Sequence, residues 1–188
     1  MSWGFARLQV ALVATIAAAG AMALGLVAWR DEQAAPVLRT PSRQQLEAYE
    51  DALTPHAKRG GFIVEEGLKY GLGQVSRDEG GPVPFQAISW ADQLTDVRRE
   101  FNAQSHFVRG TRLEPAVADF DAAFALYIDA ARTIGAAAIA SGEPRRKLVD
   151  QAAETGRRAD ANYDAASALI QRFRREHGLP PTARFPDP

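Results

Sequence analysis

Apolar residues recur every three or four positions through the second half of the chain, which is the spacing of helices that bury one face. The pattern is clearest over residues 114–140 and over residues 144–177. Between them, Ser141–Pro144 is typical of a helix end followed by a helix start, with Gly142 as the C-terminal cap and Pro144 as the first residue of the next helix. The two segments therefore predict a long antiparallel helical hairpin.

A weaker helical pattern occupies residues 41–75. Thr40 and Pro41 are typical of an N-cap and of the first position of a helix. Pro55 and the pair Gly60–Gly61 predict a kink or a break, because proline and glycine both destabilise a helix interior. The helical spacing resumes after that pair, so we expect two shorter or kinked pieces here.

The stretch of residues 76–84 contains two glycines and two prolines and predicts a loop. Ser89 then resembles an N-cap, so a helix is expected from there to about Gly110. The pieces GGFIV and PVPF have the composition of strands, but two isolated strands cannot build a stable sheet. The prediction is an all-α fold, with an antiparallel bundle of about four helices over residues 41–177 and a proline-rich tail at residues 178–188.

Aromatic residues at helical spacing supply the expected bundle core. A stripe of this kind is more typical of a core than of a ligand pocket, although a small apolar ligand between helices remains the alternative. The expected core residues are Phe101, Phe120, Phe124, Tyr127, Ile134 and Phe173.

An apolar run of 22 residues, interrupted only by Gln9 and Thr15, extends over residues 8–29. As a helix it would be about 33 Å long at ~1.5 Å per residue, and the hydrocarbon core of a bilayer is about 30 Å thick. Trp3 and Trp29 bracket the run at positions suited to the two membrane interfaces. We therefore expect a single transmembrane helix that is retained as a signal anchor.

Two A-x-A patterns, at residues 17–19 and 21–23, leave open the alternative of a cleaved signal peptide. Residues 1–7 carry Arg7 and no acidic residue, so the positive-inside tendency places them in the cytoplasm. The linker at residues 30–40 and everything after it would then be extracytoplasmic. The 19 arginines against 3 lysines fit a GC-rich bacterium, so the expected location is its cytoplasmic (inner) membrane.

Small residues recur every four positions within the apolar run, at Ala17, Ala21 and Gly25. Such a seam lets a second membrane helix approach closely. The expected partners are therefore other membrane proteins or a second copy of the chain, in addition to the lipid bilayer. The alternative is chance spacing in an alanine-rich segment.

Charge and residue types restrict the chemistry. A formal net charge of −1 gives no electrostatic reason to expect nucleic acid as a partner, and the absence of cysteine excludes disulfides, thiolate metal sites and a lipidated N-terminal cysteine. His56, His106 and His177 lack the Glu-x-x-His spacing of di-metal bundles and are expected at the surface or at helix ends. No Gly-x-Ser-x-Gly motif or phosphate-binding glycine motif occurs, so we expect no catalytic residue, metal or cofactor.

The remaining charged residues predict solvated helix faces. Neighbouring acids such as Glu65–Glu66 and the pair Asp119 and Asp121 point to different sides of a helix. Arginines and acids alternate along the last helix, which favours an ion-paired surface, with a protein-docking face as the alternative. Gly67 and Gly71 lie one turn apart and indicate close helix packing or a bend.

These patterns favour a non-enzymatic, membrane-anchored envelope protein whose bundle mediates protein–protein interaction, for example as an accessory subunit of a membrane complex. The alternative is an anchored or secreted bundle that binds a small apolar ligand between its helices. A hydrolase is the least favoured, because no nucleophile and base are visible together.

Overall fold

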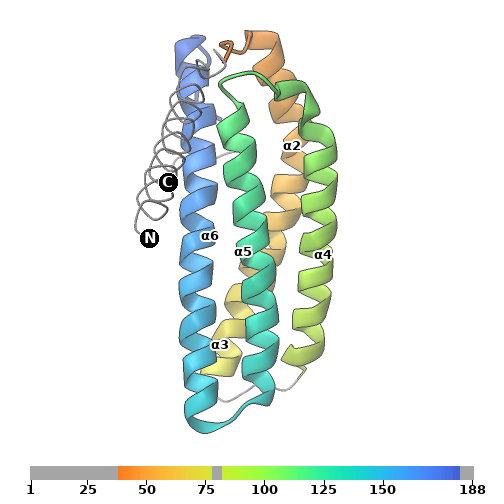
Figure 1. Ribbon diagram of the computed structural model, residues 1–188, viewed down its shortest axis with the longest axis vertical. Coiled ribbons are helices and arrows are strands. Elements are labelled where there is room, and N and C mark those ends of the chain that lie inside the picture. Colours follow the sequence, from red (N-terminus) through yellow and green to blue (C-terminus); the bar gives the residue numbers. More distant parts are fainter. Residues whose placement is uncertain (1–37, 78–81, 183–188) are drawn as a thin grey trace, which may run out of the picture. The chain divides into compact units, whose positions relative to one another are not determined.

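The computed structural model of the chain describes residues 38–77 and 82–182, and this part is an antiparallel bundle of four helical segments (Figure 1). The predicted all-α class is confirmed for the described residues, where no strand forms. The elements are α2 (Arg43–Phe62), η1 (Ile63–Lys69), α3 (Tyr70–Ser76), α4 (Val83–Gln104), η2 (Ser105–Val108), α5 (Glu114–Ile139) and α6 (Gly142–Glu176). The first segment consists of α2, η1 and α3 in direct succession.

The expected membrane helix at residues 8–29 lies outside the described residues, and so do its seam of Ala17, Ala21 and Gly25 and its flanking Trp3 and Trp29. Its retention and its orientation stay predictions.

The first helical segment begins two residues later than the sequence pattern indicates. Ser42, rather than Thr40, is the N-cap of α2. Its hydroxyl accepts from the Gln45 backbone N–H at 3.2 Å, and its own N–H donates to Gln45 Oε1 at 2.9 Å. This reciprocal pair gives hydrogen-bond acceptors to two backbone N–H groups at the start of the helix, whereas a single cap serves only one.

The sequence predicts a kink or a break at Pro55 and Gly60–Gly61, and the break does not occur. The helix α2 passes through both sites, and η1 and α3 continue it to Ser76. An interior proline costs about 3 kcal/mol, but apolar residues on both sides of it are anchored in the core and favour one continuous segment. The irregularity lies in η1, a π-helical stretch with i→i+5 hydrogen bonding. The anchoring residues are Leu46, Tyr49, Leu53, Ala57, Ile63 and Val64.

Helix α4, in contrast, starts earlier than predicted. α4 begins at Val83, with Pro84 in its first turn, and Ser89 lies inside it and accepts a hydrogen bond from Gln93. Proline at the start of a helix costs nothing, because its missing N–H would have no partner there. Pro84 therefore marks the start of this helix more reliably than Ser89, which only resembles an N-cap.

At the same end of the bundle as the start of α4, the turn between α5 and α6 lies where the sequence predicts it, but Ala140 is the C-cap of α5 and Gly142 is the first residue of α6 (Figure 1). Gly142 has a φ of 62°, and Pro144 lies in the first turn of α6. A positive φ is the conformation that glycine adopts at a helix end without steric cost. The predicted hairpin of α5 and α6 is confirmed.

The central helix is α5, which packs against α4 on one side and α6 on the other. The Phe101 ring of α4 meets Phe120 and Phe124 edge to face, each with 5.6 Å between ring centroids. Among the described residues, α5 is the one helix long and apolar enough to cross a membrane by length and composition. Its position between two other helices accounts for that composition.

Polar contacts close the end of the bundle at which α2 begins. The backbone of Arg39 pairs with Gly110 and Arg112 beside the start of α5, and His177 Nε2 lies 2.8 Å from the Pro41 carbonyl oxygen. Leu38 and Arg39 therefore belong to the compact unit that contains the bundle.

One arginine of the last helix is buried instead of solvated. Arg174 donates to Glu50 Oε2 at 2.5 Å, and the two side chains are 11% and 3% exposed. Desolvation of both charges offsets most of their attraction, but removal of one partner would leave a buried charge unpaired. The pair therefore fixes the position of α2 against the end of α6.

A second polar contact joins α4 to α5. Asp121 accepts from Arg98 Nε at 2.6 Å, from Arg98 NH2 at 2.7 Å and from Asn102. The hydrogen bonds from Arg98 hold the pKa of the Asp121 carboxyl below its ordinary value, against the opposing effect of burial. The expectation that Asp121 is only a solvated acid is therefore wrong. Its two donor residues, Arg98 and Asn102, belong to α4, and the sequence around Asp121 does not reveal them.

Trp90 of α4 packs directly on the backbone of the first segment, in a notch formed by Gly67 and Gly71. A Cβ atom added at Gly67 would lie 2.8 Å from Trp90 Nε1, and one at Gly71 would lie 2.6 Å from Cζ3 of the same ring. Both distances are too short for real contacts. The expected close packing at these glycines is confirmed, and the notch brings η1 and α3 against α4.

The substitution Gly71→Ala tests the notch. We expect it to destabilise the fold by about 1–3 kcal/mol through overpacking, even though alanine is better than glycine in a helix by about 1 kcal/mol. The matched control is Gly61→Ala, where an added Cβ meets nothing within 4 Å. That variant should be equally stable or more stable than the wild type in thermal unfolding followed by circular dichroism. Equal stability of the two variants would show that Trp90 does not occupy the notch.

Candidate functional site

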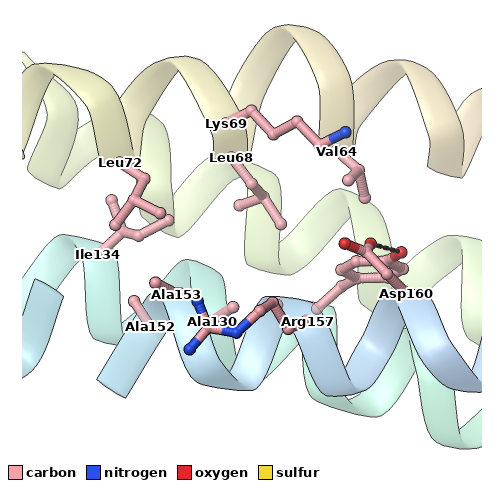
Figure 2. Close-up of a pocket in the computed structure, with 12 residues that line it drawn as sticks. Val64, Leu68, Lys69, Leu72, Ala130, Ile134, Ala152, Ala153, Arg157 and Asp160 are labelled. Atoms are coloured by element: carbon pink, nitrogen blue, oxygen red, sulfur yellow. Dashed lines mark hydrogen bonds between the residues drawn. The ribbon is translucent and has the colours of Figure 1, made fainter. Parts of the chain in front are cut away.

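A groove opens beside η1, where the first helical segment lies across from α6 (Figure 2). Its cavity has a volume of about 250 Å³. Mostly aliphatic side chains of the first segment form one wall, three residues of α5 form the floor, and mostly small residues of α6 form the other wall. The residues are Val64, Leu68, Lys69 and Leu72, then Tyr127, Ala130 and Ile134, then Ala152, Ala153, Gly156, Arg157 and Asp160.

The groove exists because neither wall fills the space between them. In this region η1 packs chiefly against α4 and α5, whereas α6 packs along α5. Ala152, Ala153 and Gly156 occupy the middle of the α6 face at the groove, beside Arg157 and Asp160, and a Cβ added at Gly156 would meet nothing within 4 Å. Side chains this short cannot reach Leu68 or Leu72, so an apolar surface stays accessible.

A polar mouth adjoins the apolar part of the groove. A second cavity of about 350 Å³ shares Val64, Lys69, Tyr127 and Asp160 with the first, so the two adjoin. At the mouth the lining changes from aliphatic to aromatic and charged. The additional residues are Gly60, Gly61, Glu65, Phe124, Tyr163 and Asp164.

The best-defined polar contact in the groove joins α5 to α6. The Tyr127 hydroxyl donates to Asp160 Oδ1 at 2.6 Å, as the dashed line in Figure 2 shows. Burial first, and then this hydrogen bond to Asp160, raise the pKa of Tyr127 well above its ordinary value. Tyr127 therefore stays protonated at all physiological pH values and acts as a fixed donor that orients the Asp160 carboxylate.

The two cations of the groove already have acidic partners one turn away. Lys69 donates to Glu65 at 2.5 Å, and this hydrogen bond raises the pKa of Lys69 in spite of partial desolvation. Arg157 donates to Glu154 through both Nε and NH2. Their positive charges are thus largely offset by carboxylates on the same helical segment.

The structure places all six expected core residues inside the bundle, and only half of them reach the groove. Phe124, Tyr127 and Ile134 line its cavities, whereas the other three pack elsewhere in the core. The groove is therefore mainly aliphatic, and the aromatic stripe contributes to its mouth instead of forming its walls. The exposed fractions are 2% for Phe101, 1% for Phe120, 2% for Phe124, 7% for Tyr127, 2% for Ile134 and 0% for Phe173.

The histidines lie away from the groove. His106 is exposed, and His177 contacts the start of the bundle, as expected for surface or capping positions. His56 departs from that expectation, because its side chain is only 15% exposed and lies 3.4 Å from Glu100 of α4. Within the described residues, no group of three or more His, Asp or Glu side chains is arranged to hold a metal ion.

Sequence reasoning missed the groove, although its parts are visible in the sequence. Ala152, Ala153 and Gly156 form a small-residue face on a helix that is otherwise rich in long charged side chains. Asp160 and Asp164 follow four residues apart and so share a face. The missing information was which helix lies opposite this face and how far away it lies.

No family model, characterised protein or solved structure matches this chain. The functional interpretation therefore rests on the geometry and chemistry of the groove.

Proposed function

We propose that the chain is a non-enzymatic binding protein of the bacterial envelope whose bundle takes the apolar part of a small ligand into the groove between η1 and α6. The observation that carries this proposal is the accessible aliphatic cavity of about 250 Å³ that ends at a polar mouth. Binding sites for small molecules are typically concave, mostly apolar and equipped with a few polar groups that set orientation. The groove has these properties.

The size of the cavity sets the size of the ligand. It lies just below the ~300–1,000 Å³ that is usual for drug-sized ligands, so a ring system of several rings would not fit. At roughly 30 Å³ per water-sized group, the cavity holds about eight such groups. An unbranched chain of about eight carbons matches this volume.

The free energy of binding from the alkyl chain alone would be small. Burial of each methylene contributes about 0.8 kcal/mol, and association costs at least about 4 kcal/mol in lost translational and rotational freedom. Eight methylenes therefore leave at most about 2.4 kcal/mol, which is a dissociation constant of about 20 mM or weaker, so tighter binding needs contacts at the polar mouth.

The lining of the groove favours binding over catalysis. Among the described residues that line its two cavities there is no serine, threonine or histidine, Glu65 accepts from Lys69, and Asp160 accepts from the protonated Tyr127. A nucleophile with an adjacent base is the usual requirement for hydrolysis. The lining supports the non-enzymatic part of the proposal.

Binding of n-octanol by the full-length chain in lipid nanodiscs tests the groove. We expect saturable shifts of the methyl NMR signals of Leu68, Leu72 and Ile134, with those of Leu46 and Leu113 at the closed end unchanged. Ala153→Trp should abolish the shifts because the indole would fill the cavity. The matched control is Ala161→Trp, on the exposed side of the same helix, and it should retain them.

Shifts spread over all methyl groups, or equal binding by the two tryptophan variants, would contradict a ligand in this groove. Empty nanodiscs supply the correction for octanol that dissolves in lipid.

The anchor is also a proposal. The apolar run at residues 8–29 is long enough to span a bilayer, and Arg7 before it favours a cytoplasmic N-terminus. With that orientation the bundle and its groove are extracytoplasmic, on the outer side of the inner membrane. A retained anchor keeps the bundle at the membrane surface, where amphipathic molecules are concentrated.

A protein-docking function is the second candidate, because three large apolar side chains near the junctions of α3, α4, α5 and α6 are exposed. Phe85 and Ile88 are one turn apart on α4 and are 80% and 62% exposed, and Ile139 at the end of α5 is 79% exposed. Exposed apolar groups on a soluble surface often mark contacts with other proteins. The partner would be another membrane protein or a second copy of this chain.

Gentle extraction of the protein from its native membranes tests both the anchor and the docking candidate. We expect the intact mass of the full chain, 20.4 kDa, instead of a product shortened by about two dozen residues. Integral membrane proteins or a second copy should be recovered in stoichiometric amount if the docking candidate is correct. A shortened mass would refute the anchor, and a lone chain would refute the docking partner.

A further inference from the structure

We infer that the ligand of the groove is a cationic amphiphile, namely a single unbranched alkyl chain that ends in a primary ammonium group. This inference rests on the proposed binding function and specifies the head group that the mouth selects. It is carried by the charges and aromatic rings that surround the mouth.

Acidic side chains outnumber basic ones at the mouth. The second cavity is lined by Glu65, Asp160 and Asp164 against Lys69 alone. Lys69 is hydrogen-bonded to Glu65 and also interacts electrostatically with Asp160, so three carboxylates share one cation and the mouth keeps an excess of negative charge. A ligand cation would complete the charge balance at this position.

The two aspartates are arranged for a common ligand. They lie four residues apart on α6 and line the same cavity, so their carboxylates face one side of the helix. Tyr127 holds Asp160 through one hydrogen bond to Oδ1, and a carboxylate has capacity for several more. An ammonium group with three N–H donors matches such a pair of acceptors.

Aromatic rings strengthen the preference for a cation. Phe124, Tyr127 and Tyr163 line the mouth beside the aspartates. The face of an aromatic ring attracts a cation within about 6 Å, and attracts it most where water is partly excluded. Burial of Tyr163, to which the nearby charge of Asp164 adds, raises its pKa, so its ring stays neutral next to the ligand.

The apolar part of the groove fits the alkyl chain of the same molecule. Ala152 at the apolar end and Asp160 at the mouth are eight residues apart on α6, which is about 12 Å along a helix. Figure 2 shows Leu68 and Leu72 above the groove, Ala152 and Ala153 below it, and Asp160 at its right-hand side. The chain and the head group of one amphiphile therefore meet matching surfaces in the right order.

Two other occupants fit less well. An anionic head group would have to compete with Glu65 for Lys69 and with Glu154 for Arg157, and it would face two aspartates. A lysine side chain of a partner protein has only a four-carbon stem, which fills about half of the apolar cavity. A free amphiphile with a longer chain uses the whole groove.

Three ligands of equal chain length test the head group: octylammonium, octanol and octanoate. Dissociation constants come from the methyl shifts of Leu68 and Leu72, with the full-length chain in zwitterionic nanodiscs at pH 7. We expect octylammonium to bind about tenfold tighter than octanol, because it adds charge-assisted contacts at the mouth, and octanoate to bind most weakly. Butylammonium should bind roughly a hundredfold more weakly than octylammonium, because four methylenes are lost.

Substitutions at the mouth locate the selectivity. Asp164→Asn and Asp160→Asn should each weaken octylammonium about tenfold and leave octanol unchanged, since asparagine keeps an oxygen that accepts from Tyr127. The matched control is Glu176→Gln, an exposed acid of the same helix about 24 Å farther along it than Asp160, and it should change neither constant.

The outcomes distinguish failure of the cationic ligand from failure of the binding groove itself. Equal affinity for all three head groups, or selectivity that survives both aspartate substitutions, would overturn the cationic ligand and leave the groove as a binding site. Loss of all binding to the wild-type chain would overturn the groove itself. Tight binding of butylammonium would point to a lysine side chain of a partner protein and against a free amphiphile.

Discussion

The contact of Trp90 with Gly67 and Gly71 is the constraint on which the shape of this bundle depends. The indole occupies the space where two Cβ atoms would otherwise lie, so the backbone of η1 and α3 approaches α4 more closely than side chains normally allow. The first helical segment is therefore committed to α4 and α5. Its other side, which carries Leu68 and Leu72, is left across from α6 without a side chain large enough to cover it.

Polar contacts at one end of the bundle limit how far this groove extends. The buried pair of Glu50 and Arg174 joins α2 to α6, and His177 reaches the carbonyl oxygen of Pro41. Past the other end of the groove, α3 again contacts α6. The opening thus lies beside η1 and the adjoining turns of α2 and α3. π-Helical irregularities such as η1 are frequent at functional sites.

Helical periodicity was sufficient to predict the class of the fold, the long hairpin and the close packing at Gly67 and Gly71. Periodicity did not predict the helix boundaries correctly, because local signals from proline and from capping residues gave conflicting predictions there. Pro55 was expected to kink or break a helix that tertiary packing keeps continuous, and Ser89 resembled an N-cap although the helix had already begun at Val83. Local propensity is a weak guide wherever buried residues on both sides of a site are anchored in the core.

The groove could not be predicted, because it depends on the distance between two helices instead of on the pattern within one. The small face of α6 around Ala153 is visible in the sequence, but an alanine-rich face is equally typical of tight helix packing. The pair of Asp160 and Asp164 likewise resembled a solvated face. Only the position of η1 opposite α6 shows that small residues and acids border one accessible cavity.

The most direct test of the account is the orientation of an alkylammonium ion in the groove, measured by intermolecular nuclear Overhauser effects on the full-length chain in nanodiscs. The account predicts that the terminal methyl group of octylammonium contacts Leu72 and Ile134, while the methylene next to the nitrogen contacts the ring of Tyr163. Contacts of the ligand with Phe85, Ile88 and Ile139 in place of these residues would contradict it, because they would move the binding site to the exposed apolar residues of α4 and α5.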